Sequence, residues 1–194
     1  MKYGIESRAP EFFDGPPDLA VAGPNVGNNI GVAVYFSGTA GATTYAASAG
    51  IPAIAFSGAT GSQTSWNVSR PNYSDVYADL ATNLTNHVVA AGKPYLPDGI
   101  WLNVNFGSVS DSECPNPQDF SFVLSRIHVA VPLVTPHDVT TCGDTRLPSE
   151  IEVSLASGCW ASVSVGLASS KSDANATMQG VVLQKLGNLL TCLP

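Results

Sequence analysis

The stretch that decides the fold is DLAVAGPNVGNN at residues 18–29, FSGTAGAT at 36–43 and GIPAIAFSG at 50–58. Leu19–Ala22 is a short apolar run typical of a buried parallel strand, and Pro24–Asn29 has the composition of a turn-forming loop. Thr39–Ser48 is rich in Ala, Gly and Thr, which favours a helix lying close to a sheet. The loop and the helix start are dense in amides, hydroxyls and free backbone N–H groups, so this unit suits an anion or a metal–phosphate site.

Further along, the alternation of strands and helices continues. Residues 73–91 form an amphipathic pattern with one apolar face. That face consists of Tyr73, Val76, Tyr77, Leu80, Leu84 and Val88. Strands are expected at 18–23, 52–57 and 100–106, and a β-α-β-α-β order predicts a parallel sheet with helices on both faces, a three-layer α/β/α fold of Rossmann-like type.

The pattern changes after residue 106. Residues 107–119 form a Pro/Ser/Asp loop, followed by three expected β segments at 120–127, 151–155 and 159–166 that would extend the sheet in antiparallel fashion. Residues 174–191 are expected to form a terminal helix. The whole chain, 1–194, is interpreted as one domain, because 194 residues suit a single core.

Composition favours a secreted, loop-rich protein. Only 12% of residues are charged, and there are 18 Gly and 14 Pro. The formal net charge of −7 disfavours nucleic-acid polymers and anionic membranes as partners but leaves room for a small phosphorylated substrate at one local site. There is no run of about 18 apolar residues, so no membrane span is expected. Residues 1–8 lack the apolar region of a leader, and we expect the parent protein to begin upstream.

The chain has four cysteines, and none forms a C-x-x-C pair. They are Cys114, Cys142, Cys159 and Cys192. Two disulfides are favoured, with Cys114–Cys142 and Cys159–Cys192 slightly preferred among three connectivities. Glycosylation sequons begin at Asn67, Asn72, Asn83 and Asn175, which also indicates the secretory pathway.

Several motifs together resemble the survival protein SurE family of metal-dependent phosphatases and nucleotidases. These motifs are GPNVGNN at 23–29, SGTAGA at 37–42, GIPAIAFS at 50–57 and LNVN at 102–105. The C-terminal half, with TCGDTRLP at 141–148 and GCWASVSV at 158–165, is similar to secreted fungal members described as SurE-like acid phosphatases. The resemblance covers nearly all of the chain.

The resemblance implies a divalent cation, Mg²⁺ or Mn²⁺, at the carboxyl ends of the sheet strands. The family's metal-binding Asn corresponds to Asn25. Ser37, Gly38 and Thr39 would lie near the substrate phosphate, with Asn29 as a further substrate-binding residue. The family's adjacent Asp pair has no counterpart, because this sequence contains no Asp-Asp. We therefore expect a chain that lacks the N-terminal segment carrying the pair, as a fragment, through a misplaced gene start or as a degenerate family member, with weak or no activity of its own.

Each of these residues also has a simpler interpretation. Asn25 suits a turn, and Ser37 and Thr39 suit a helix cap. The histidines are scattered, and Asp138 and Asp144 are interpreted as solvated turn carboxylates. Two functions remain open: a secreted phosphomonoesterase, or a non-catalytic secreted domain that binds a phosphorylated ligand or a protein. The apolar strand at 18–23 is expected to leave an exposed edge through which the chain could form homo-oligomers.

Overall fold

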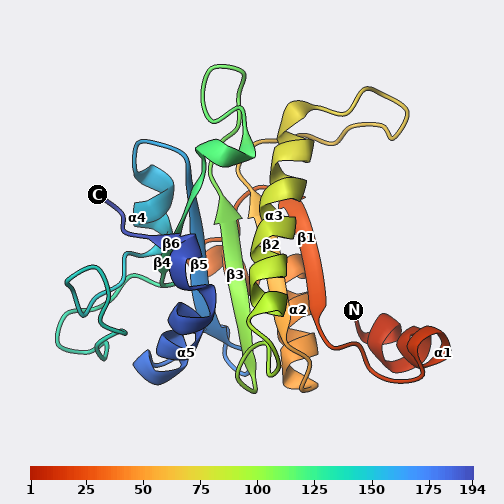
Figure 1. Cartoon of the computed structure of the whole chain (residues 1–194), viewed down its shortest axis with the longest axis horizontal. Helices are drawn as coiled ribbons and strands as arrows, with labels where there is room; N and C mark the ends of the chain where they lie inside the picture. Colours follow the sequence, from red (N-terminus) through yellow and green to blue (C-terminus); the bar gives the residue numbers. More distant parts are fainter.

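A computed structural model describes all 194 residues and is built on one six-stranded sheet in the order β1-β2-β3-β5-β4-β6 (Figure 1). The strands are β1 (Ala20–Val26), β2 (Ala53–Gly58), β3 (Ile100–Phe106), β4 (Ser121–Ser125), β5 (Trp160–Leu167) and β6 (Leu190–Thr191). β1, β2 and β3 are adjacent and parallel, as the sequence predicts. The first strand begins two residues later than expected and continues through Asn25.

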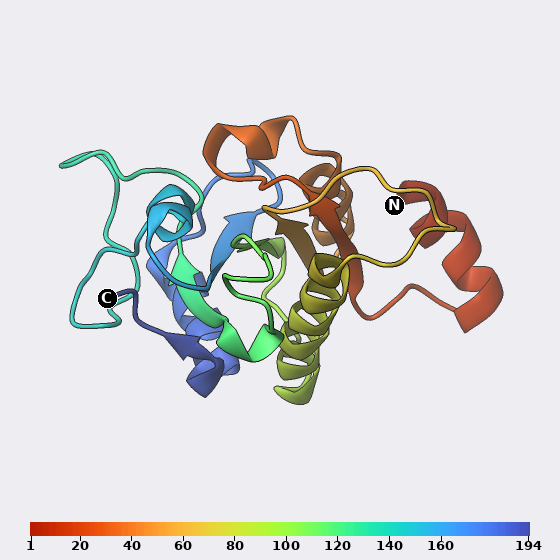
Figure 2. The same ribbon diagram turned by 90° about the horizontal axis from the view of Figure 1, so that it is seen from above.

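Helices cover both faces of this sheet. They are α2 (Gly38–Ser48), α3 (Asn72–Ala90), α4 (Glu150–Leu155) and α5 (Ala176–Leu186). The π-helix η1 (Gly4–Arg8) and α1 (Ala9–Phe13) precede β1 and project beyond its edge of the sheet (Figure 1). Short 3-10 turns are η2 (Gly31–Tyr35), η3 (Pro117–Asp119) and η4 (Gly187–Leu189). Seen from above, α2 and α4 lie on one side of the sheet and α3 and α5 on the other (Figure 2). The predicted three-layer α/β/α architecture is confirmed.

The two faces of the sheet carry different side chains. In β3, Leu102, Val104 and Phe106 point into a large apolar core shared with α3 and α5. On the other face, Trp101 packs with the alanines of α2, whose small side chains let the helix lie close to the sheet. Asn103 and Asn105 alternate with the apolar residues, so by the period-two rule they belong to the α2 face. Both are buried.

Three expectations for the C-terminal half are wrong in detail. Residues 151–155 form helix α4 and not a strand, because Ser149 and Glu152 make a capping box at its start. The terminal helix is shorter than 174–191, since it ends at Gly187, which has a φ of +48°. The extension of the sheet is antiparallel only between β3 and β5, whereas β4 pairs in parallel with β5 and β6.

All four cysteines are in disulfides, but the preferred pairing is wrong. Cys114 bonds Cys159, and Cys142 bonds Cys192. The sheet order explains the first bridge. β5 inserts beside β3, and Gly107 N donates to Trp160 O at 2.9 Å, so the loop that leaves β3 lies next to Cys159. The second bridge ties the loop before α4 to the chain end after β6.

Candidate functional site

The candidate site is built on Asn25, at the carboxyl end of β1. The pairing of β1 with β2 shifts register between Ala22 and Asn25, which sets Asn25 opposite Ser57. Gly23 permits this path, because it has a φ of +100° and a Cβ there would lie 2.1 Å from the Phe56 carbonyl oxygen. Only glycine therefore suits the position.

Two side chains hold the carbonyl oxygen of Asn25. Asn29 Nδ2 donates to Asn25 Oδ1 at 2.7 Å, and Ser57 Oγ donates to the same oxygen at 3.0 Å. Asn25 Nδ2 donates to the backbone oxygens of Val26 at 3.1 Å and Gly27 at 2.8 Å. The orientation of the Asn25 amide is thus fixed on both sides.

The backbone of Asn29 is held in turn by β3. Asn29 N donates to Asn105 Oδ1 at 2.8 Å, and Asn103 Nδ2 donates to Asn29 O at 2.8 Å. The residues joined here come from the carboxyl half of β1, β2 and β3 and from the loop after β1. Asn25 and Asn29, which the sequence singles out, are brought together by a 2.7 Å hydrogen bond.

One buried amide oxygen in this network has no partner in the chain. Asn103 is fully buried, and both of its Nδ2 hydrogen bonds are made, yet its Oδ1 accepts nothing. The hydroxyl of Ser162 on the neighbouring β5 is also buried and unpaired. Buried polar atoms are nearly always satisfied, so these atoms point to a water molecule or ligand atom inside the network.

The expected phosphate-binding residues lie at the start of α2. Ser37 is the N-cap, and its Oγ accepts from Ala40 N at 3.0 Å. The N–H groups of Gly38 and Thr39 have no acceptor within the chain, as is usual in the first turn of a helix. The cap and the anion-binding interpretations are therefore compatible, because a helix start of this kind offers free donors and the positive end of the helix dipole.

A lysine lies beside this helix start. Lys171 Nζ donates to Val34 O at 3.2 Å and to Tyr35 O at 3.5 Å. It is also 4.0 Å from the position that a Cβ on Gly41 would occupy, which places it against the first turn of α2. A cation next to a helix N-terminus is electrostatically unfavourable by itself and becomes favourable when an anion binds between them.

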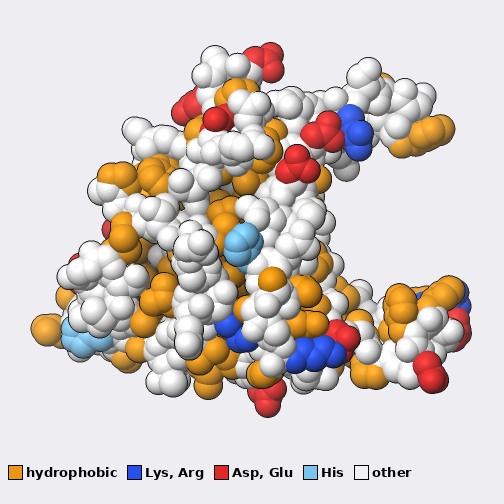
Figure 3. All heavy atoms as spheres, in the orientation of Figure 1, with side chains coloured by type: hydrophobic (Ala, Val, Ile, Leu, Met, Phe, Trp, Pro, Cys, Tyr) orange, Lys and Arg blue, Asp and Glu red, His pale blue; other side chains and the backbone are white.

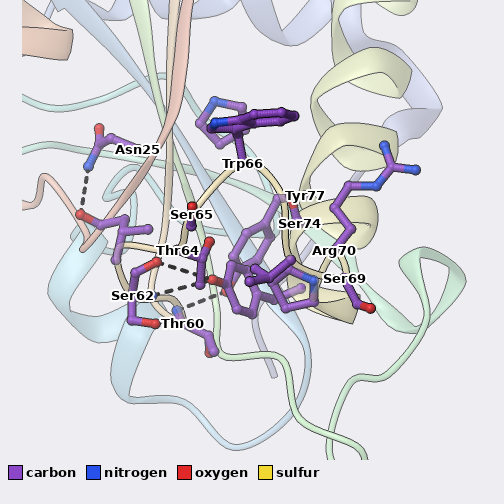
Figure 4. Close-up of a pocket in the computed structure, with 15 residues that line it drawn as sticks. Asn25, Thr60, Ser62, Thr64, Ser65, Trp66, Ser69, Arg70, Ser74 and Tyr77 are labelled. Atoms are coloured by element: carbon purple, nitrogen blue, oxygen red, sulfur yellow. Dashed lines mark hydrogen bonds between the residues drawn. The ribbon is translucent and has the colours of Figure 1, made fainter.

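A pocket of about 290 Å³ opens next to Asn25 (Figure 4). Figure 4 shows Asn25 on one side, Arg70 on the other and Trp66 above, with many hydroxyl groups between them. The indole of Trp66 is 95% exposed. Burial raises the pKa of Tyr77, whose hydroxyl donates to Gly107 O at 2.9 Å at the base of the pocket. The pocket therefore has a polar floor and an aromatic rim.

The residues present at Asn25 do not form a complete site for a divalent cation. No group of three or more His, Cys, Asp or Glu residues in the chain is placed to hold a metal ion. The nearest donors are the neutral side chains of Asn25, Asn29 and Ser57. Mg²⁺ usually takes one or two carboxylates in addition. Asn25 Oδ1 already accepts two hydrogen bonds, so it could bind a cation only by giving up one of them, and the charge would have to come from elsewhere.

The four predicted glycosylation sites are all exposed. Asn67 lies in the loop before α3, Asn72 begins that helix, Asn83 is on its outer face, and Asn175 is the N-cap of α5. Asn72 Nδ2 already donates to Pro115 O at 2.9 Å, so a glycan there would have to replace this bond. Glycosylation stays a prediction.

Sequence reasoning missed four residues of the network: Ser57, Asn103, Asn105 and Lys171. For the two asparagines a signal was present, because LNVNF alternates amides with large apolar residues in a strand that is otherwise buried on both faces. Polar side chains at alternate positions of such a strand mark a polar layer. The sequence did not indicate Lys171, because the carbonyl groups of Val34 and Tyr35 that it contacts are 137 and 136 positions away in the chain.

Comparisons with a family model and with individual proteins point to the same family. A family model described as "Survival protein SurE" matches residues 1–124. The chain is 33% identical over 192 residues to a protein named "Acid phosphatase" from Yarrowia lipolytica, covering 85% of this chain and 54% of the relative. It is 39% identical over 103 residues to a "5'-nucleotidase SurE" from Desulfatibacillum aliphaticivorans, covering 53% of this chain and 36% of that protein. The chain thus spans about half, or less, of the curated relatives' length.

The fold has a solved counterpart. The crystal structure of a SurE protein from Aquifex aeolicus aligns with a TM-score of 0.55 and 18% identity, covering 94% of this chain and 70% of that one. At this identity the likeness concerns the fold. No helix has both the length and the apolar character that crossing a membrane requires.

Proposed function

Since the chain belongs to the SurE family, we propose that it takes part in the hydrolysis of a small phosphomonoester outside the cell. The names of its relatives, acid phosphatase and 5'-nucleotidase, support a phosphatase-type function. The overall reaction would consume one water molecule and release an alcohol and inorganic phosphate. The disulfides and the fungal acid phosphatase relative are compatible with an extracellular protein.

The observation that carries the proposal is the start of α2. The phosphate would accept hydrogen bonds from the free N–H groups of Gly38 and Thr39 and from the Thr39 hydroxyl, with Lys171 close enough to balance its charge. Such a site would bind and orient the phosphate through these donors alone. Where a divalent cation is present, Asn25 is the residue of this chain that would contact it, and the cation would supply charge neutralisation.

The pocket beside Asn25 is proposed to take the organic part of the substrate. Its hydroxyl groups suit the hydroxyls of a sugar, and the exposed face of Trp66 suits a flat apolar group. Arg70, on the far side, is held by an ion pair with Asp75 at 3.2 Å and could contact a second anionic group. The face drawn in Figure 3 carries few basic side chains and no broad basic patch.

A second candidate is a domain that binds a phosphorylated ligand without hydrolysing it. The observation that favours it is the neutral donor set around Asn25, where no carboxylate of the chain contacts the amide. Such a set can orient a ligand, but it offers no group to take a proton from water.

The two candidates are separated by measuring binding and turnover together. Phosphate release from an aryl phosphate and from nucleoside monophosphates would be followed with and without Mn²⁺, and binding of inorganic phosphate by calorimetry. Release of phosphate supports the enzyme, and binding without release supports the second candidate. If the chain neither releases nor binds phosphate, both candidates are wrong. Thr39→Val should weaken phosphate binding, whereas Thr82→Val, at an exposed threonine of α3, is the matched control.

A further inference from the structure

The buried acid Glu150 has no role in the site described so far. It is the first residue of α4 and is fully buried. Its Oε1 accepts from Asn103 Nδ2 at 2.7 Å, and its Oε2 lies 3.4 Å from Gly31 N, which donates to it. It forms no ion pair with any Lys, Arg or His. Burying a carboxyl group without a cationic partner costs folding free energy, so the position of Glu150 needs an explanation.

The contacts of Glu150 join it to Asn25 through three hydrogen bonds. Asn103 Nδ2 donates both to Glu150 Oε1 at 2.7 Å and to Asn29 O at 2.8 Å, so the acid fixes the orientation of the amide that holds the loop. Asn29 then donates to Asn25 Oδ1 at 2.7 Å. The same acid reaches the next turn of this loop at Gly31.

We propose that Glu150 is a positioning residue, which holds the 28–31 loop against β3 and thereby sets where Asn25 and Asn29 present their amides. That Asn25 and Asn29 bind a ligand rests on the proposed function. That Glu150 anchors the 28–31 loop does not depend on it.

Its protonation state supports this role. Burial raises the pKa of Glu150 to about 8, although hydrogen bonds from Asn103, the Ser164 hydroxyl and the Gly31 amide act to lower it. The negative charge of Asp173, which pairs with Arg126 at 3.2 Å, raises the pKa further. Glu150 is therefore a neutral acid at pH 7. The Ser164 hydroxyl, which bonds to this carboxyl, lies 2.7 Å from Ser125 Oγ.

The anchor then depends on pH in a defined sense. As the pH rises through about 8, the carboxyl ionises. A buried carboxylate without a cation needs water, so α4 and the loop must separate for water to reach it. Loosening of the 28–31 loop in alkaline solution is the expected consequence, with the helices of the opposite face unaffected.

Hydrogen–deuterium exchange on the full chain tests the anchor directly. After correction for the intrinsic exchange rate, peptides that cover 28–31 should exchange at least about tenfold faster at pH 9 than at pH 6, while peptides from α3 stay protected. Glu150→Gln, which mimics the neutral acid, should abolish this rise. Glu150→Leu should expose 28–31 at both pH values. Glu152→Ala, which removes the capping box of the same helix, is the control and should leave 28–31 protected.

Two outcomes would overturn the proposal: a Glu150→Leu protein with normal protection of 28–31, or a Glu150→Gln protein with the wild-type alkaline rise. If Glu150→Leu does not fold, the Glu150→Gln profile decides. Calorimetry with inorganic phosphate at pH 6 is run in parallel. If the wild-type chain does not bind phosphate, the proposed function is contradicted. The role of Glu150 as an anchor is decided by the exchange experiment alone.

Discussion

Asn29 donates a 2.7 Å hydrogen bond to the side-chain oxygen of Asn25, four positions before it. The bond closes the loop after β1 on itself and turns the Asn25 amide into a fixed group. Asn29 also donates to Ser57 Oγ at 2.6 Å, so a single side chain ties the loop to β2. The arrangement makes Asn29 the central residue of the candidate site.

Replacing Asn29 should therefore cost stability. Asn29→Ala removes two side-chain donors and leaves Asn25 Oδ1 with Ser57 alone, so a loss of about 1–3 kcal/mol is expected. Urea unfolding checks this. Asn86→Ala, at an exposed asparagine of α3, should change the unfolding free energy by less than about 0.5 kcal/mol. Equal effects of the two variants would show that the bond contributes nothing.

The stability of the protein should fall as the pH rises from about 4.5 to about 8, through Glu150. In this window the unfolded chain has released the proton of Glu150 and the folded chain has kept it, so unfolding takes place with proton release. The slope is then about −1.4 kcal/mol per pH unit from this group. Unfolding midpoints measured across the window in wild type and Glu150→Gln check it, since the difference between the two proteins isolates the one carboxyl. Parallel curves would contradict the prediction.

Asp138 should behave in the opposite sense. The sequence suggested a solvated turn carboxylate, which is wrong: Asp138 is buried and pairs with Arg126 at 2.8 Å and Arg146 at 2.9 Å. Burial acts to raise its pKa, but hydrogen bonds from Gln179 and the Leu147 amide and the charge of Arg126 together lower it. The stabilisation from this group is present above its unfolded pKa and is lost as the pH falls through its lower folded value.

Removing the charge of Asp138 should therefore be costly. Asp138→Asn leaves two arginines without their shared carboxylate, and a loss of about 3–5 kcal/mol is expected. Asp79→Asn, at an exposed carboxylate of α3, is the control. Chemical denaturation at neutral pH measures both. A loss of the same small size in the two variants would mean that the arginines are satisfied in another way.

The disulfide pairing can be read directly. Non-reducing digestion and mass spectrometry should yield linked peptides that contain Cys114 with Cys159 and Cys142 with Cys192. The closed loops span 45 and 50 positions, so each bridge should contribute about 4 kcal/mol in the chain-entropy picture. Detection of a Cys114–Cys142 peptide in folded protein would restore the pairing that the sequence favoured.

Self-association through β1 is expected as well. β1 is an outer strand that bonds only β2, and Figure 3 shows the molecule hollowed on this side, between the projecting loop before α3 and the N-terminal helices. Such an edge can pair with another strand. Val21→Lys should lower the mass measured by light scattering at high protein concentration, whereas Val89→Lys, equally exposed on α3, should not. A wild-type chain that stays monomeric at every concentration would rule out the edge as an interface.

The sequence by itself determined the elements whose signals are local. The apolar runs at 52–57 and 100–106 specify buried strands, and the spacing from Tyr73 to Val88 specifies α3, because side-chain period is fixed by backbone geometry. Asn25, Ser37 and Thr39 were singled out as ligand-binding residues through the family motifs, while their local chemistry alone suited a turn and a helix cap. The capping box formed by Ser149 and Glu152 is also a local signal, which the expected strand at 151–155 did not take into account.

Only the tertiary structure decided what depends on which strands become neighbours. The insertion of β5 between β3 and β4 sets the disulfide pairing and brings Ser164 and Asn103 into register. The packing of α4 against the sheet brings Glu150 into hydrogen-bond contact with Asn103, 47 positions away in the chain. Burial at this position raises the pKa of the Glu150 carboxyl to about 8. Neither sequence distance nor residue type encodes such contacts, because burial and hydrogen-bond partners are properties of the assembled sheet and not of the local chain.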